Sequence, residues 1–291
     1  MKFSLYFLLI LFTISGYSQD TLHRHYILLE QYVKLGNNLT KQDSLNFQFK
    51  GEDTLVLVSP DFLERNNNGI RVEYEPKDSL FLEIYKDVVY GKMNSEQREK
   101  ETMKYWKDEI KIFFASGVPQ DHSQKLMEFA KEISSEIDSL KITKVDNKEQ
   151  SNFMIYYLNR EYNIDYEPRI NNRNGGYYIN WNAKQQIYKG YVKINTEFVK
   201  NENDQVQLLF FHFFKSLGYF KSSEKLNCES YLSACRVPRR LTQSDREILK
   251  YHYSYGICKG VILKTFNELH ESMQKTLRHN PKAQLYVVHS E

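Results

Sequence analysis

Short runs of alternating polar and apolar residues occupy the first third of the chain. They lie at residues 45–49, 55–59 and 69–74, and turn-forming Asn and Gly residues separate them. A period of two puts successive side chains on opposite faces of a strand. We therefore predict a small β-rich region over residues 19–95, in which residues 80–90 form either a further pair of strands or a short helix.

A helical period begins after this region. A charged stretch at residues 95–107 is expected to be helical, and it leads into an apolar strand at residues 110–114. The apolar residues that follow are spaced to cover one face of a helix over residues 123–140. They are Leu126, Phe129, Ala130, Ile133, Ile137 and Leu140.

Strands and helices alternate again in the second half of the chain. Strands are predicted at residues 152–158 and 190–195, and the polar residues between them predict a long loop. An apolar stretch at residues 205–217 predicts a second long helix. Asp204 can cap its start, and Gly218 can end it through a left-handed turn.

A last strong helix is predicted to begin at Thr242 and Asp245 and to run to about Tyr253, because a capping hydroxyl and a carboxylate precede an apolar period. The resulting order of elements is β-α-β-β-α-loop-α. This order indicates an α+β or α/β fold.

The first residues have the pattern of an export signal. Lys2 precedes the apolar run of residues 3–14, and the small residues Gly16 and Ser18 suit cleavage before Gln19. The run is shorter than the roughly 20 residues that span a bilayer, and no later segment is apolar enough to do so. We expect a signal peptide at residues 1–18, and a mature protein that is periplasmic or secreted.

Composition and charge narrow the class of partner. The chain has 22 Tyr and 18 Phe against 12 Gly and 6 Pro, which is typical of an ordered globular protein. The formal net charge of +3 falls to +2 without Lys2. This balance argues against nucleic acid as a partner, and no sequence motif indicates a cofactor.

Three cysteines, Cys228, Cys235 and Cys258, lie in the C-terminal third of the chain. In an oxidising compartment Cys228 could pair with Cys235, or either could pair with Cys258, and one thiol would remain. A catalytic cysteine is disfavoured, because no His–Asn or His–Asp pattern accompanies any of the three.

The stretch LLFFHFFKSLGYFK, residues 208–221, has the outline of a zinc-hydrolase helix without its metal ligands. In such a helix two histidines lie four residues apart around a catalytic Glu, a glycine turns the chain, and a third histidine follows. Overlaid on that pattern, Gly218 falls on the glycine and His212 on the Glu. The three ligand positions fall on Phe211, Lys215 and Lys221. None of them is a good zinc ligand at neutral pH, so we expect neither a metal site nor catalytic residues of this type.

These motifs and their order resemble the metzincin-like zincins, over roughly residues 105–255. They resemble more closely a family of exported bacterial proteins of unknown function that keeps the zincin fold and often lacks the full zinc motif. The resemblance implies a mixed sheet with two long helices and a C-terminal helix over residues 96–256, followed by an extension at residues 257–291. It also implies that Leu232 stands in place of the Met-turn methionine, and that the closing helix brings His252 and Tyr253 near the former active site.

Other residues could carry chemistry but have simpler explanations. His212, within an aromatic run, fits a buried structural histidine better than a proton shuttle. Glu197 and Glu202 could pair as acid and base, although capping and solvation explain them better. The loop of residues 171–178 with Trp181 could hold a sugar or a peptide, and Arg236, Arg239 and Arg240 could meet an acidic partner; solvated loops explain both.

The sequence therefore predicts an exported, non-catalytic protein with a degenerate zinc-metalloprotease-like domain, acting by binding an unknown protein, peptide or glycan. One alternative is a hydrolase that uses a non-standard site in the inherited cleft, with His212, His252, Glu229 or Tyr253. Another is a structural or scaffolding protein whose N-terminal region makes the contacts.

Overall fold

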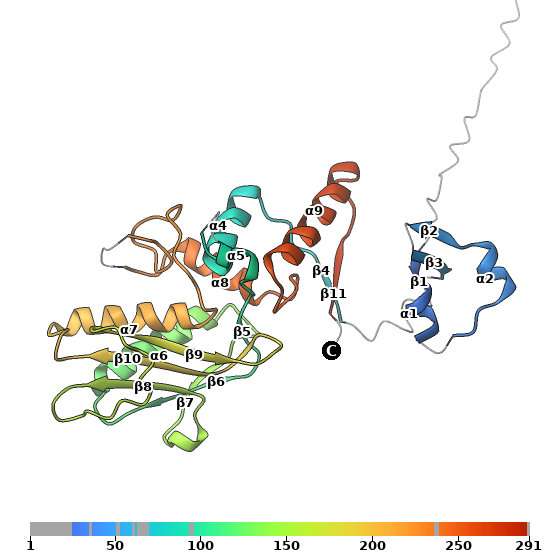
Figure 1. The fold of residues 1–291 in the computed structure, drawn as a ribbon. Coiled ribbons are helices and arrows are strands. Elements are labelled where there is room, and N and C mark those ends of the chain that lie inside the picture. Colours follow the sequence, from blue (N-terminus) through green and yellow to red (C-terminus); the bar gives the residue numbers. More distant parts are fainter. Residues whose placement is uncertain are drawn as a thin grey trace, which may run out of the picture. The chain divides into compact units, whose positions relative to one another are not determined.

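The computed structural model describes residues 25–34, 37–50, 53–59, 62, 70–92, 96–235 and 239–289. The contacts divide the chain into two compact units, one ending at Ile70 and the other spanning Arg71–His289 (Figure 1). The expected signal peptide lies outside the described residues. Within the described residues, none of the helices has the length and apolar character needed to cross a membrane.

The first unit contains a small antiparallel sheet. Its strands β1 (His25–Leu28), β2 (Gln48–Lys50) and β3 (Asp53–Val58) lie in the order β1-β3-β2, and two short helices, α1 (Leu29–Lys34) and α2 (Lys41–Leu45), join them. The strand predicted at residues 45–49 starts later than expected. The reason is a capping box in which Thr40 and Asp43 exchange hydrogen bonds and begin α2.

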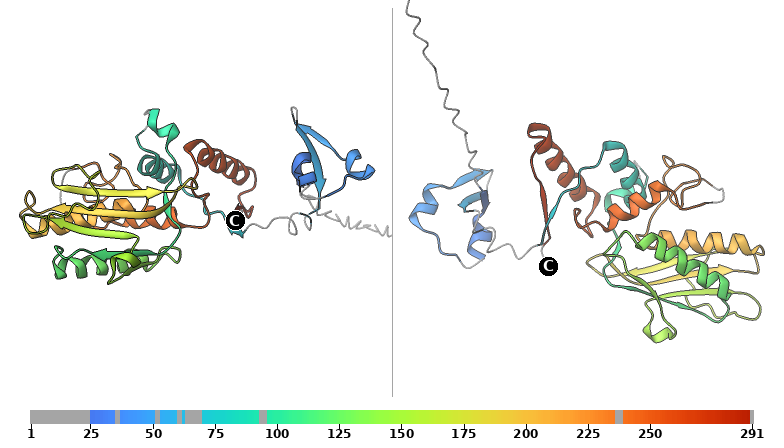
Figure 2. Two further views of the ribbon diagram at one scale, coloured as in Figure 1. Left: turned by 60° about the horizontal axis from the view of Figure 1, so that its bottom comes forward. Right: turned by 180° about the vertical axis from the view of Figure 1, so that it is seen from behind.

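The second unit is built on a mixed sheet with the strand order β7-β6-β8-β10-β9. All pairs are parallel except β10 with β9, and the two-residue strand β5 (Tyr105–Trp106) pairs in parallel with the start of β10. Figure 2 shows the sheet from two further sides. The strands are β6 (Ile110–Phe114), β7 (Ile142–Lys144), β8 (Phe153–Leu158), β9 (Gly175–Trp181) and β10 (Gln186–Asn195).

Two long helices, α6 (Gln120–Ser134) and α7 (Glu202–Ser216), contact each other and the sheet, α7 against β9 and β10. The alternation along β8 separates two cores. Phe153 and Ile155 belong to the large core shared with these helices, whereas Met154 and Tyr156 belong to a small cluster with Ile170 and Tyr191.

Four further helices and a strand pair complete the second unit. Tyr85 of α4 stacks against Phe266 of α9 and meets Tyr251 of α8 edge-on. The contacts thus place α4 and α9 in the second unit, whereas the sequence suggested boundaries near residues 95 and 256. The elements are β4 (Ile70–Glu73), α4 (Ser79–Tyr90), α5 (Glu96–Lys100), α8 (Gln243–Tyr253), α9 (Leu263–His279) and β11 (Tyr286–His289), with β4 paired to β11.

Several predicted boundaries are corrected. Helix α6 ends at Ser134, although Ile137 and Leu140 beyond it are still buried. The charged stretch at residues 95–107 holds only the short helix α5 before β5 begins. Asn201 rather than Asp204 caps α7, because its side chain accepts a hydrogen bond from the Asp204 backbone.

Candidate functional site

Helix α7 presents three of the five motif positions beside strand β9. Phe211, His212 and Lys215 lie in its last turns and are partly buried, while Phe213 and Phe214 of the same turns are fully buried in the core. The ring of His212 lies 6.1 Å from that of Tyr177 on β9. The aromatic run therefore packs one side of α7 into the core and leaves the motif positions at the edge of the sheet.

The chain reverses after α7 at Tyr219 rather than at Gly218. Tyr219 has a φ of 54°, the left-handed conformation expected of the glycine, whereas Gly218 has an ordinary φ. Gly218 is needed for space instead: a Cβ there would lie 2.4 Å from the Phe220 ring and 2.9 Å from Nε2 of His252. The glycine position of the motif therefore serves close packing, and a tyrosine carries the strain.

Around Tyr219 an ionic network occupies the third ligand position. Lys221 lies over the Tyr219 ring, 3.5 Å from its centroid, and its Nζ is 3.3 Å from the Glu101 carboxylate. Glu101 also accepts a hydrogen bond from Lys104, whose buried ammonium lies 5.0 Å from the centre of the Trp181 ring. One carboxylate thus contacts two ammonium groups, and these groups also lie against the rings of Tyr219 and Trp181.

The environment shifts the pKa values of this network. Burial lowers the pKa of Lys221 to about 8 even though Glu101 acts in the opposite direction. Burial would raise the pKa of Glu101, but the hydrogen bond from Lys104 and the charge of Lys221 outweigh it, so its pKa lies below the ordinary value. The carboxylate is therefore ionised at neutral pH.

A second group of polar side chains surrounds Phe211. The guanidinium carbon of Arg239 lies 4.2 Å and the Nζ of Lys215 lies 5.2 Å from the centre of the Phe211 ring, and the His212 ring centre is 5.1 Å away. We call Lys215, Arg239 and His212 the Phe211 cluster. In the described part of the chain the cluster contains no carboxylate contact; Lys215 donates only to the Ser222 hydroxyl, at 2.9 Å.

The Phe211 cluster holds titratable groups in disfavoured states. Burial, with the nearby charges of Arg239 and Lys221, lowers the pKa of Lys215 to about 8. Burial, with the charges of Lys215 and Arg239, lowers the pKa of His212 to about 3, so this imidazole is neutral at pH 7. Within the described ranges, its Nδ1 and the Nε of Arg239 are buried atoms without a hydrogen-bond partner.

His252 and Tyr253 lie beneath the motif as structural groups. His252 is fully buried; its Nε2 donates to the Lys104 carbonyl at 2.9 Å, so its Nδ1 accepts from the Tyr85 hydroxyl at 3.0 Å. Burial, with the charge of Lys259, lowers its pKa to about 3. The Tyr253 hydroxyl donates to the Leu217 carbonyl at 2.6 Å. Both side chains hold the end of α8 against the chain around α7.

Leu232, in the predicted Met-turn, is buried in the core within a turn that Asp245 fixes to the start of α8. The fully buried Asp245 carboxylate accepts from the Ser230 hydroxyl at 2.6 Å and from the backbone of Tyr231 and Leu232 at 3.2 and 3.3 Å. It also completes the predicted capping box with Thr242. One carboxylate therefore supports both the turn and the helix.

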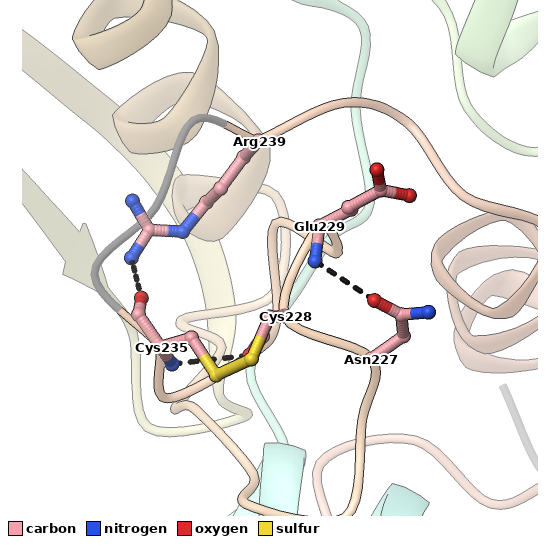
Figure 3. The surroundings of a disulfide bond; sticks show 6 residues. Asn227, Cys228, Glu229, Cys235 and Arg239 are labelled. Carbon is pink, nitrogen blue, oxygen red and sulfur yellow. Dashed lines mark hydrogen bonds between the residues drawn. A yellow bond between two sulfur atoms is a disulfide. The ribbon is translucent and has the colours of Figure 1, made fainter.

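A disulfide joins Cys228 to Cys235, with 5.1 Å between their Cα atoms, and leaves Cys258 as a free thiol. This resolves the pairing that the sequence left open. Figure 3 shows that the guanidinium of Arg239 turns back toward the closed loop, where one of its nitrogens donates to the Cys235 carbonyl at 2.6 Å. The disulfide loop thus anchors one member of the Phe211 cluster.

The remaining candidates are dispersed. Glu197 lies 3.6 Å from Arg160, and Glu202 occupies the first turn of α7, so the two carboxylates have separate roles. Arg240 pairs with Glu229, whereas Arg236 lies outside the described residues. Of the residues 171–178 and Trp181, Tyr177 and Trp181 lie beside the site, with their ring centres 6.4 and 5.4 Å from that of Tyr219.

Sequence reasoning missed Glu101 and Lys104, because a charged stretch is normally a solvated surface. It also missed a pocket of about 600 Å³ at the C-terminal end of α8, where Lys259 donates to the His252 carbonyl. The pocket contains both acidic and basic side chains. It is lined by Tyr105, Trp106, Lys107, Asp108, Glu109, Asp138, Ser139, Lys141, Tyr253, Tyr255 and Lys259.

In the described ranges, no three His, Cys, Asp or Glu residues lie close enough together to hold a metal ion. At the motif positions the available groups are two ammonium ions, a guanidinium and a neutral imidazole. Such an arrangement is suited to attracting negative charge.

Comparison with known proteins does not assign the chain to a family. No family model matches it, and no curated protein sequence gives a significant match.

Replacing Lys215 by Met should stabilise the protein by about 1 kcal/mol at pH 7, because it removes a cation that burial disfavours. The folded-state pKa of Lys215 is about 8, below its ordinary value. The unfolded chain therefore binds more protons between pH 8 and the ordinary lysine pKa, and stability should rise with pH through that window. Urea unfolding at pH 7 and 9.5 measures this.

Lys264→Met is the matched control, because Lys264 is exposed on α9. The control should leave both the stability at pH 7 and its rise with pH nearly unchanged. Equal pH profiles for wild type and Lys215→Met would contradict the prediction.

Proposed function

We propose that this is an exported, non-catalytic protein with a degenerate zincin-type domain that acts by binding a ligand at the former active-site position. The observation that carries the proposal is the replacement of the ligand set. Where the pattern requires three zinc-binding side chains, the chain has Phe211, Lys215 and Lys221. Lys215 and Arg239 both lie against the Phe211 ring, and Lys221 pairs with Glu101. Positive side chains and a bound zinc ion would repel each other at the same position.

The arrangement of the second unit supports the zincin part of the proposal. The unit contains a mixed sheet, two long helices and a closing helix, which are the parts that the resemblance implies. Helix α7 carries the motif next to the edge strand β9, and Tyr253 at the end of α8 hydrogen-bonds to the last residue before the glycine. These features agree with the resemblance in kind and in order.

Export is supported by two further observations. The first eighteen residues have the composition of a cleavable signal, and the Cys228–Cys235 disulfide suits an oxidising compartment.

The hydrolase alternative finds little support in the histidines. A general base needs a lone pair that can reach a substrate. Both nitrogens of His252 are engaged inside the core, and burial with nearby cations lowers the pKa of His212 to about 3, which makes it a weak base. We therefore favour binding over hydrolysis.

Metal content tests the proposal directly. Purified mature protein, dialysed against excess zinc and then against zinc-free buffer, should retain well below one equivalent by elemental analysis and should cleave no peptide in a chelator-sensitive manner. Phe211→His, Lys215→His and Lys221→His combined in one variant provide the comparison, because they restore the missing imidazoles. Stoichiometric zinc in the unmodified protein would overturn the proposal.

A further inference from the structure

We propose that the Phe211 cluster is a binding site for an anionic group, a carboxylate or a phosphate, carried by the ligand. The inference deepens the proposed function, since it rests on this position being a binding site, but it does not depend on zincin ancestry. It is argued from the charge balance, from unpartnered polar atoms and from the way the cluster is held.

The charge balance of the cluster is incomplete. Lys215 and Arg239 both lie against one Phe211 ring, and no carboxylate in the described part of the chain contacts either of them. The three residues that precede Arg239 and lie outside the described ranges are Arg, Val and Pro, so they add no acid. An aromatic face compensates a cation only in part. The pair therefore retains positive charge that an anion would neutralise.

The neighbouring carboxylate is already engaged. Glu101 contacts Lys221 and Lys104, on the side of the motif that faces Tyr219 and Trp181. Its negative charge is shared by two ammonium groups, so none of it remains for the Phe211 cluster. The two ionic groups thus differ in charge balance. The group around Glu101 contains its own counter-ion, whereas the Phe211 cluster has none in the described part of the chain.

Unpartnered polar atoms provide a second, independent observation. The Nε of Arg239 and the Nδ1 of His212 are buried and have no hydrogen-bond partner among the residues that the structure describes. Buried donors normally have partners, and an exception calls for a missing one. Arg239 can donate through Nε, and His212 can donate through Nδ1 in the corresponding tautomer, so an oxyanion satisfies both.

The cluster is also fixed in place and accessible. Two of its members share the last turns of α7, and the disulfide loop holds Arg239 by the hydrogen bond to the Cys235 carbonyl (Figure 3). Phe211, Lys215 and Arg239 each keep part of their surface exposed. A small anionic group can therefore approach without unfolding α7, and it would find donors that are already oriented.

Binding should also change protonation. An anion beside Lys215 and His212 favours their charged forms, which burial and mutual repulsion now disfavour. Binding near pH 8 should therefore be accompanied by proton uptake at Lys215, and affinity should fall as the pH is raised above this range. A surface site of ordinary lysines would show no such change below about pH 10.

The test is calorimetric titration of the mature protein with inorganic phosphate and, separately, with acetate, at constant ionic strength set by chloride. The wild type should bind at least one of the two anions, and preference between them would identify the class of group. Arg239→Gln and Lys215→Met should each weaken binding by about tenfold or more, as expected for the loss of a charge-assisted hydrogen bond.

Arg240→Gln is the matched control, because it removes one arginine charge at the next position in the chain. The Arg240 side chain already pairs with Glu229 and is not part of the Phe211 cluster. It should bind as the wild type does. Lys215→Arg keeps the positive charge and should retain most of the affinity. It therefore distinguishes the loss of charge from the loss of the folded structure. Circular dichroism melting checks that each variant is folded.

The inference is overturned if neither anion binds in the millimolar range, or if folded Arg239→Gln and Lys215→Met bind as tightly as Arg240→Gln. These outcomes leave the proposed function intact, because its own test is zinc retention. Conversely, a protein that retained zinc would refute the non-catalytic role whatever its affinity for phosphate.

Discussion

Replacing Asp245 by Ala is expected to destabilise the second unit by about 4 kcal/mol, the largest effect that we predict for a single side chain. The carboxylate is fully buried and accepts hydrogen bonds from Ser230, Tyr231 and Leu232 in the turn and from Thr242 at the start of α8. Alanine would leave the buried Ser230 hydroxyl and the Tyr231 N–H without this acceptor, whereas the Leu232 N–H keeps its bond to the Ser230 hydroxyl. Urea unfolding followed by circular dichroism measures the loss.

The chain offers a control with the same local chemistry. Asp43 and Thr40 form an equivalent capping box on α2, but neither is buried: Thr40 is exposed and Asp43 is half-buried. Asp43→Ala should therefore cost about 1 kcal/mol or less, because water replaces the lost acceptor. A similar small loss for Asp245→Ala would mean that burial adds nothing to the box, and it would contradict the prediction.

Replacing Glu101 by Gln should cost about 2 kcal/mol at pH 7, because it leaves the ammonium groups of Lys104 and Lys221 without a counter-charge. The side chain of Lys104 is 6% exposed, whereas that of Lys221 is 27% exposed, so we expect less than for a fully buried pair. Chemical denaturation of the two proteins measures the difference. Glu149→Gln, at an exposed position, should leave stability unchanged.

The effect of Glu101→Gln should depend on pH. The pKa of Glu101 is lowered in the folded protein, so the unfolded chain binds more protons in the window between the lowered and the ordinary value. The stability that the carboxylate contributes is complete above the ordinary value and disappears as the pH falls through the lowered one. Wild type and variant should therefore converge once the pH lies below the lowered pKa of Glu101. A difference that stayed constant down to that pH would contradict this explanation.

Local signals in the sequence were sufficient where a single element carries its own pattern. The strand at Ile110–Phe114 and the helix from Thr242 to Tyr253 have the predicted extents, because an apolar run and a capping box are decided within a few residues. Helix α6 starts earlier and ends earlier than predicted. The apolar residues after its end keep the helical spacing and are buried, although the backbone there is no longer helical. The spacing of apolar residues therefore reported burial rather than helix at these positions.

The site could be predicted only in part. The motif positions on α7 follow from the sequence, but their partners come from distant segments. Lys104 is buried beneath the rings of Trp181 and Tyr219, and the left-handed residue is Tyr219 because Gly218 is needed for packing. Similarly, Arg239 reaches Phe211 through a loop that the disulfide closes. Contacts of this kind depend on the tertiary fold and produce no periodic pattern in the sequence.

The position of strand β10 also determines when the second unit can form during synthesis. Its neighbours β8 and β9, and β5 at its start, all precede it in the chain, so the sheet cannot close until residue 195 has been added. Tyr253 must then accept a hydrogen bond from the backbone of Trp106, which is made almost 150 residues earlier. At ordinary rates of translation this interval is on the order of 10 s. During that time apolar strands made early remain uncovered, which exposes the nascent chain to aggregation.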